Sequence, residues 1–342
     1  MRSVVSAVVV VLVAAVFVPA TAAGAHPHRD PPTVGVSFPS DFPVILDAST
    51  GDPVIGFGGS GRLRRVPMIF LHGNNDTPFP TVCNPYGTVH DIAQFFADRG
   101  YRTSELWGLG YQGDQCDLLV DPTIRSGSTH TVAANVDDLR RFVHAVLEYT
   151  GAKRVDVVAH SLGVTLTREW MRQDNAYNKV RHLVGLAGPE HGIISCSPNP
   201  LNFFQLPEQG GFTPGSAVCQ EFGTDHTPLL STLNADDETP GRTRYLMVRN
   251  ADSDFVYISA PDGLIPAVPA EDAEGNAHDF SHSPFLDGAC NVSLTGQGIY
   301  DPILGTGHLG LAASPDAMQL AFDFVRRNKS PCQGPQPPGH QA

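Results

Sequence analysis

The fold of this chain is decided by one stretch, VDVVAHSLGVTLTREW, which spans residues 155–170. Its apolar beginning predicts a buried strand, and the residues after Gly163 predict a helix. Ser161 lies between the two, in the pattern A-H-S-L-G, where the small Ala159 stands at the first position of G-x-S-x-G. A strand, a sharp turn with serine at its apex and an immediate helix form a nucleophile elbow, which exposes the hydroxyl. The alternative is a serine that only caps a helix.

The chain on both sides of this stretch alternates short β-rich runs with amphipathic helices. The runs predict strands at residues 66–71, 102–108, 154–159, 180–186 and 244–248. Apolar spacing and helix stop signals predict helices at residues 89–98, 132–147, 162–173 and 315–326. This alternation indicates an α/β fold, with a mainly parallel central sheet that is flanked by helices.

One region breaks the alternation. Residues 189–241 are rich in Gly, Pro, Asn and Phe and contain two of the cysteines. We interpret them as an irregular, lid-like insertion over the crevice beside Ser161, and the alternative is a disulfide-tied surface loop without a role in substrate binding. A single domain is then expected over residues 26–330, followed by a Pro-rich tail over residues 331–342 that is expected to be disordered.

The N-terminus predicts export. Arg2 precedes an uncharged apolar run over residues 4–18, and small residues follow, so residues 1–25 are expected to be a signal peptide. The run is shorter than the ~20 residues that span a bilayer, so we expect a secreted protein without stable membrane insertion. A formal net charge of −13 argues against nucleic acid or an anionic membrane as a partner. The mature chain is expected to be a monomer.

The six cysteines all follow the expected signal peptide. An even number in an exported chain predicts three disulfides. Proximity along the sequence favours the pairs Cys83–Cys116, Cys196–Cys219 and Cys290–Cys332. No cysteine or histidine spacing is typical of a zinc site, so no metal is expected. Residues 56–61 match G-x-G-x-x-G, but a strand follows them instead of a helix, so we expect no bound dinucleotide.

Activation of the Ser161 hydroxyl would require a histidine and an acid. After an elbow of this type they follow in the order serine, acid, histidine. Asp254 comes just after the expected strand at 244–248 and is the candidate acid, with Asp252 as its competitor. His308 is the candidate base, because glycines beside it permit a tight loop that returns the imidazole to the serine.

The other histidines near these positions are given different roles. His278 and His282 lie in a polar stretch without strand context and are interpreted as surface residues. His160 precedes the serine and is expected to pack behind it. A tetrahedral intermediate also needs N–H donors, which we assign to the backbone amides of Leu162 and of Asn74, in the loop HGNND at residues 72–76. The alternative for that loop is a tight turn without a catalytic role.

These motifs resemble those of the bacterial class 2 lipases of the α/β-hydrolase superfamily. The similarity lies in FLHGN at residues 70–74, VDVVAHSLG at 155–163, the segment around Asp254, and GTGHLGL at 305–311. The chain is also similar to a lipase-like extracellular poly(3-hydroxybutyrate) depolymerase, in PMIFLHGN, in RGY at 99–101 and in the elbow. That second resemblance favours Asp254 over Asp252. The region 189–241 does not follow the smallest lipases.

The resemblance implies an α/β-hydrolase fold and a secreted serine ester hydrolase without a cofactor. Ser161 would attack an ester carbonyl, His308 would transfer the proton, and Asp254 would orient His308. Asn74 and Leu162 would bind the oxyanion. The expected substrates are acylglycerols or simple esters, with a polyester as the alternative. Two further possibilities are a non-enzymatic binding protein of the same fold and peptidase or amidase chemistry with the same residues.

Overall fold

The computed structural model describes residues 31–198, 206–258, 270–298, 306–327 and 332. The expected signal peptide at residues 1–25 lies outside the described residues, and so does the expected tail apart from Cys332. Within the described part of the chain, no helix is long and apolar enough to cross a membrane.

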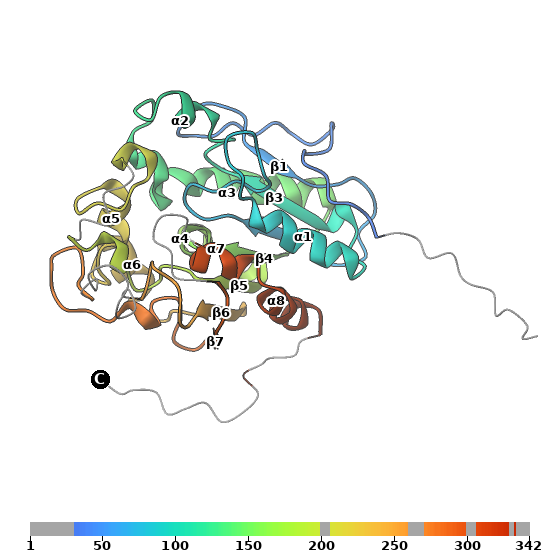
Figure 1. Cartoon of the computed structure of the whole chain (residues 1–342). Coiled ribbons are helices and arrows are strands. Elements are labelled where there is room, and N and C mark those ends of the chain that lie inside the picture. The colour runs from blue at the N-terminus through green and yellow to red at the C-terminus, as the bar shows by residue number, and fades with distance from the viewer. Residues whose placement is uncertain (1–30, 199–205, 259–269, 299–305, 328–331, 333–342) are drawn as a thin grey trace, which may run out of the picture. The chain divides into compact units, whose positions relative to one another are not determined.

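The core of the described chain is a seven-stranded sheet in the order β1-β3-β2-β4-β5-β6-β7. Only β1 is antiparallel to its neighbour, and the other pairs are parallel (Figure 1). The strands are β1 (Ile55–Phe57), β2 (Met68–Leu71), β3 (Leu106–Gly110), β4 (Val155–His160), β5 (Val180–Leu186), β6 (Arg244–Asn250) and β7 (Cys290–Leu294). The expected α/β-hydrolase type of sheet is therefore confirmed.

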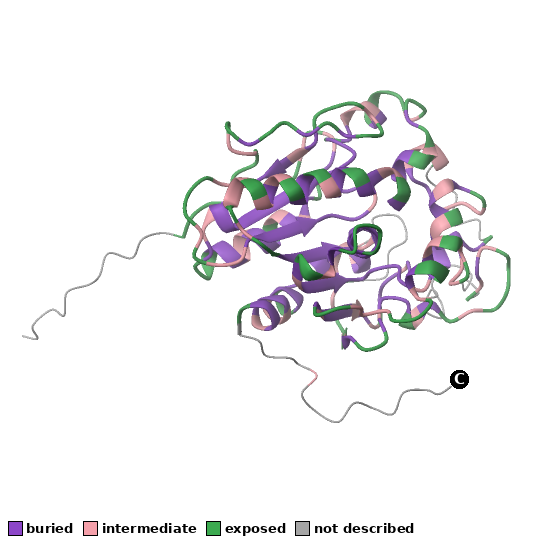
Figure 2. Ribbon diagram, turned by 180° about the vertical axis from the view of Figure 1, so that it is seen from behind, coloured by how far each residue is buried: buried purple, intermediate pink, exposed green. Residues whose placement is uncertain are grey.

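Helices cover both faces of this sheet. The helices of the described chain are α1 (Thr88–Asp98), α2 (Cys116–Val120), α3 (Val132–Thr150), α4 (Leu162–Gln173), α5 (Ala217–Phe222), α6 (Pro228–Leu233), α7 (Thr306–Ala312) and α8 (Pro315–Arg327). Helices α1 and α8 contact each other on one face, and α3 and α4 contact each other on the opposite face (Figure 1). Every residue of β2, β3 and β4 is buried between these layers (Figure 2). Such double coverage explains why these strands are apolar without alternation.

Two strands were not expected from the sequence. β1 lies in the glycine-rich segment, where a side chain at Gly56 would come within 2.2 Å of Gly108 O and of the Phe38 ring. The glycine therefore serves close strand packing. β7 is an edge strand with exposed Asn291 and Ser293, so its sequence lacks a continuous apolar run.

The strand expected at residues 102–108 begins later, at Leu106. Residues Thr103–Glu105 form a 3-10 turn instead. The buried Glu105 carboxylate accepts the backbone N–H groups of Arg102 at 2.9 Å and of Arg65 at 2.7 Å, and these bonds stabilise the turn.

All three expected disulfides are confirmed: Cys83–Cys116, Cys196–Cys219 and Cys290–Cys332. The second lies within region 189–241, which is less irregular than expected. It contains α5, whose N-cap Ser216 accepts from Cys219 N, and α6, which begins at Pro228. Proline at the first helical position supports the start of a helix, because no hydrogen bond is lost there. Residues 199–205 of this region lie outside the described residues.

Candidate active site

Ser161 lies at a strained turn between β4 and α4. Its φ of 52° and ψ of −129° are unusual for a residue other than glycine. The strain is held by the sheet, because Ser161 N donates to Leu186 O at 2.8 Å, and by α4, where Val164 N donates to Ser161 O at 2.9 Å. A side chain at Gly163 would lie 2.6 Å from His72 O, so glycine is required there. The serine hydroxyl belongs to a half-buried residue at the start of α4.

The loop after β2 reaches this elbow. A side chain at Gly73 would lie 2.8 Å from Ser161 Cβ and 3.3 Å from Ser161 Oγ. The Gly73 backbone therefore contacts the serine directly, and Asn74 is the next residue. Leu162 follows Ser161 as the first residue of α4. The structure thus brings Ser161, Leu162 and the Gly73–Asn74 segment together.

Asp254 and His308 form a hydrogen-bonded pair. His308 Nδ1 lies 2.9 Å from Asp254 Oδ2 and 3.1 Å from Oδ1. The Asp254 side chain is fully buried, and its Oδ1 also accepts Val256 N at 3.0 Å. The competitor Asp252 is exposed and accepts Gly296 N at 3.1 Å. The structure therefore brings His308 to Asp254 and leaves Asp252 on the surface.

The position of His308 differs from the expectation in one respect. It lies in the first turn of α7 and not in a loop, although the glycines beside it indicated a tight loop. Asn250 Nδ2, at the end of β6, donates to Gly307 O at 2.9 Å and fixes the start of this helix. His308 is nine-tenths buried, with the Tyr257 ring centroid 5.9 Å from its own.

His160 links His308 to the elbow. Its Nε2 donates to the backbone oxygen of His308 at 3.2 Å, and the two ring centroids are 4.6 Å apart. Because Nε2 carries the proton, Nδ1 is unprotonated, and it has no hydrogen-bond partner among the described residues. Burial holds the pKa of His160 well below its usual range. His160 is thus a packed neutral residue, in the role expected from the sequence.

His308 thus lies against His160, the residue that precedes Ser161 in the chain. Among the described residues no hydrogen bond joins the Ser161 hydroxyl to the His308 imidazole, a contact that in many enzymes without substrate is long and shortens when substrate binds. Of the other histidines, His282 is exposed as expected, but His278 is half-buried against Phe280, at 4.3 Å between ring centroids.

Sequence reasoning gave no role to the buried acid Asp76. Its Oδ1 accepts Thr77 N at 2.8 Å and Gly87 N at 2.9 Å, and its Oδ2 has no hydrogen-bond partner among the described residues. Burial raises the pKa of Asp76 to about 6, although the hydrogen bonds from the Thr77 and Gly87 N–H groups act in the opposite direction. The only sequence feature that associated Asp76 with the candidate site was its position directly after H-G-N-N at residues 72–75.

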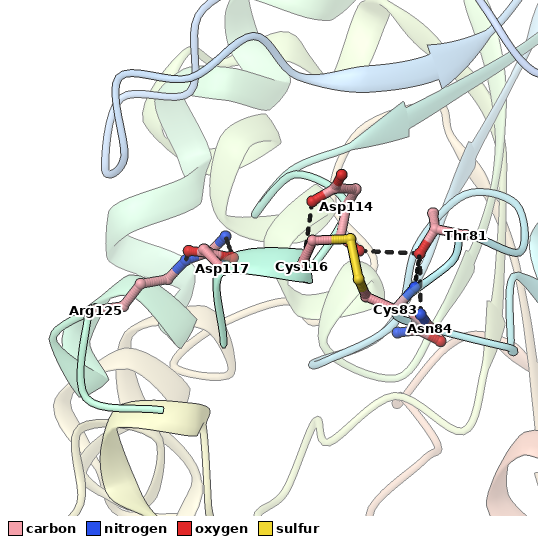
Figure 3. Close-up of a disulfide and its surroundings, with 7 residues drawn as sticks. All are labelled: Thr81, Cys83, Asn84, Asp114, Cys116, Asp117 and Arg125. Atoms are coloured by element: carbon pink, nitrogen blue, oxygen red, sulfur yellow. Dashed lines mark hydrogen bonds and ion pairs between the residues drawn. A yellow bond between two sulfur atoms is a disulfide. The ribbon is translucent and has the colours of Figure 1, made fainter. Parts of the chain in front are cut away.

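A disulfide braces the segment that follows this loop (Figure 3). Cys83 is joined to Cys116 at the start of α2, and Thr81 Oγ1 donates to Asp114 O at 3.0 Å beside it. Asn84 Nδ2 donates to Asn75 O at 2.8 Å, which connects the brace to the loop beside Ser161. The loop is therefore anchored beyond its end as well as at β2.

No metal centre accompanies these residues in the described part of the chain, where no group of three or more His, Cys, Asp or Glu side chains is arranged to hold an ion.

A family model described as Lipase (class 2) matches residues 65–261, more than half of the chain. The chain belongs to the class 2 lipases. It is accordingly a hydrolase that acts on esters. Its family match begins just before β2 and includes the loop, the elbow and Asp254, whereas His308 lies beyond it.

Solved structures of similar fold include two lipases. The mature form of lipase BlEst2 from Bacillus licheniformis is 14% identical, with a TM-score of 0.49, and the match covers 79% of this chain and 96% of that one. Lipase B from Aspergillus fumigatus is 16% identical, with a TM-score of 0.45, and the match covers 80% of this chain and 54% of that one. Similarity at this level concerns the fold alone.

Proposed function

We propose that this class 2 lipase is a secreted serine ester hydrolase with Ser161 as nucleophile, His308 as general base and Asp254 as the residue that orients His308. The backbone amides of Leu162 and Asn74 bind the oxyanion. One observation carries the proposal: His308 pairs with buried Asp254 and is also held beside the elbow through His160. The contact between Gly73 and Ser161 supports the assignment of the neighbouring Asn74 amide as an oxyanion donor.

The reaction follows from these positions. His308 accepts the proton of the Ser161 hydroxyl through Nε2 while the oxygen attacks the ester carbonyl, because Nδ1 is engaged by Asp254. The carbonyl oxygen becomes an oxyanion that the two amides stabilise. His308 then protonates the leaving alcohol, and an acyl group remains on Ser161. Water, deprotonated by the same imidazole, attacks the acyl-enzyme, and the acid is released as Ser161 regains its proton.

The proposed substrates are acylglycerols and simple carboxylic esters, in keeping with the family to which the chain belongs. Export is part of the proposal, since the apolar N-terminal run and three disulfides suit an oxidising compartment.

Labelling with a fluorophosphonate tests the nucleophile. We expect one adduct, located by peptide mass spectrometry at Ser161, and loss of p-nitrophenyl butyrate hydrolysis in proportion to labelling. Ser161→Ala is expected to abolish both, and Ser253→Ala, a serine near Asp254, is expected to label normally. A folded wild-type protein that is not labelled at Ser161 would support the non-enzymatic binding protein instead. Rates on triacylglycerol and poly(3-hydroxybutyrate) emulsions then separate lipase from depolymerase activity.

A further inference from the structure

Within region 189–241, residues 206–211 lie against the loop beside Ser161. Residues Leu206–Gly211 form a compact turn, with Gly210 N bonded to Pro207 O at 3.0 Å and Gly211 N bonded to Leu206 O at 3.0 Å. The turn therefore satisfies part of its own backbone and directs other carbonyl groups outward. We call it the 206–211 turn.

Three consecutive carbonyl oxygens of this turn lie within hydrogen-bonding distance of side chains from other parts of the chain. Asn74 Nδ2 donates to Gly210 O at 2.9 Å, and Asn75 Nδ2 donates to Gln209 O at 2.6 Å. His130 Nε2 lies 3.0 Å from Glu208 O. Two of the three side chains belong to the loop that contacts Ser161, so the turn and that loop hold each other in place.

His130 completes the arrangement from a third direction. It ends the 3-10 turn Gly127–His130, which directly precedes α3, and its side chain is fully buried. Its Nδ1 lies 3.2 Å from Asn74 Oδ1, while its Nε2 faces the 206–211 turn. His130 thus lies between the loop at residues 72–76, here called the oxyanion loop, and the 206–211 turn, within hydrogen-bonding distance of both.

Where the 206–211 turn meets His130 and the 3-10 turn Gly127–His130, there is no room for a side chain at Gly210 or at Gly127. Gly210 has a φ of +75°, and a Cβ there would lie 2.7 Å from His130 Nδ1 and 2.8 Å from Asn74 Oδ1. On the other side, a Cβ at Gly127 would lie 2.7 Å from Pro207 O. Close backbone approach on both sides indicates a fixed contact and not a passing one.

The chemistry of the ring limits what His130 can donate. Asn74 Nδ2 is used by Gly210 O, so Asn74 presents its oxygen to His130, and Glu208 also presents an oxygen. Burial, with a smaller contribution from Arg125, lowers the pKa of His130 to about 4, while the hydrogen bond to Glu208 O and, less strongly, Asp117 act in the opposite direction. The ring is neutral at pH 7 and has one N–H, so it donates to one of the two oxygens at a time.

We propose that His130 is a positioning residue that holds Asn74 against the 206–211 turn and thereby fixes the oxyanion loop beside Ser161. The inference rests on the proposed function, in which the Asn74 amide binds the oxyanion. It assigns the 206–211 turn to the active site and rejects, for this segment, the alternative of a surface loop without a role. The Asn74 side chain is the part that is held, and its backbone amide is the part that acts.

His130→Leu and Asn74→Ala test the bridge in the full chain, because both keep the Asn74 amide and remove the contact. We expect each to lower kcat for p-nitrophenyl butyrate by about 10–100-fold, as small displacements of catalytic groups do, with KM changed less than about 3-fold. The double variant is expected to be no worse than the poorer single variant, since both break one arrangement. Multiplying effects, or an unchanged kcat in His130→Leu, would overturn the inference.

Two conservative variants distinguish the two contacts and remain informative if His130→Leu does not fold. His130→Asn places an amide N–H near Nδ1 and keeps the bond to Asn74, whereas His130→Gln reaches the Nε2 position and keeps the bond to Glu208. We expect His130→Asn to retain kcat within about 3-fold of wild type and His130→Gln to lose about 10-fold. Equal kcat values, or the opposite order, would contradict a bridge through Asn74.

A matched control separates positioning from stability. His182, in β5, is also buried. Its Nδ1 lies 2.9 Å from Asp156 Oδ1, near the start of β4, whereas Ser161 follows the end of that strand. His182→Asn is expected to lower the melting temperature without changing kcat. Fluorophosphonate labelling of wild-type Ser161 distinguishes the two levels of failure: without labelling the proposed function fails, whereas labelling together with unaffected His130 variants refutes only the inference.

Discussion

The two sides of Ser161 are held by different kinds of interaction. On the base side, His308 is bonded to a fully buried carboxylate, and both residues come from segments at the carboxyl ends of the sheet. On the oxyanion side, neutral amide and imidazole groups bond to backbone oxygens of the 206–211 turn. An aspartate and a histidine can be recognised from their residue types, but bonds to carbonyl groups leave no mark in the sequence. We therefore expect catalysis to depend on the side chains of Asp254 and His308 on the base side. On the oxyanion side we expect it to depend on the position of the backbone of the 206–211 turn.

The largest expected effect tests the base side. Asp254→Asn should lower kcat by about 10⁴-fold, because an amide cannot hold His308 in the tautomer that accepts the serine proton. Asp252→Asn is the matched control two residues away, and its kcat is expected within about 3-fold of wild type. Steady-state kinetics with p-nitrophenyl butyrate measure both. If Asp252→Asn were the more damaging change, the assignment of Asp254 would be wrong.

The sequence was sufficient to predict the sheet around the elbow. β2, β4 and β5 are buried on both faces, so their apolar runs were unambiguous, and β5 has the expected bounds. Order along the chain also restricted the candidate acid and base to Asp254 and His308, whose side chains lie 2.9 Å apart in the structure. The sequence did not predict α7 or β7, because glycines in a helix and polar residues on an edge strand contradict the usual signals.

The bridge through His130 was beyond sequence reasoning for a physical reason. Asn74 and His130 are 56 residues apart, and Glu208 is a further 78 residues along the chain. Glu208 and Gly210 contribute only backbone oxygens, so their side-chain types carry no information about the contact. By contrast, the disulfides could be paired by proximity alone, because the partners are separated by only 23 to 42 residues.

A second difference between the two sides concerns their buried carboxyl groups. Asp254 is paired with His308, whereas Asp76 on the oxyanion side accepts two backbone N–H groups and has one oxygen without a partner among the described residues. Burial raises the pKa of Asp76 to about 6 in the folded state, above its value in the unfolded chain. Folding therefore favours the protonated acid.

The raised pKa of Asp76 makes the folded state less stable as pH rises. As pH rises from about 4 to 6, the unfolded state releases the Asp76 proton first, so the free energy of unfolding falls by about 3 kcal/mol and then becomes constant. Asp76→Asn should remove this contribution, since an amide does not titrate. Urea unfolding at pH 4, 5, 6 and 7 measures the difference between wild type and variant. A difference that does not change across this range would show that Asp76 is not a buried acid of this kind.

The smallest expected effect concerns the residue between the two sides. His160, at the end of β4, donates a hydrogen bond to the backbone oxygen of His308. It thus holds the base by a bond from a side chain to a carbonyl group, as on the oxyanion side. His160→Leu should lower kcat by about 10-fold with little change in KM, because the imidazole loses one restraint but keeps Asp254. His160→Gln can place an N–H near the Nε2 position and should recover most of the rate. Melting temperatures of the wild type and both variants verify that folded enzymes are compared. Equal losses of kcat in the two variants would mean that packing of the His160 ring, and not its hydrogen bond, positions His308.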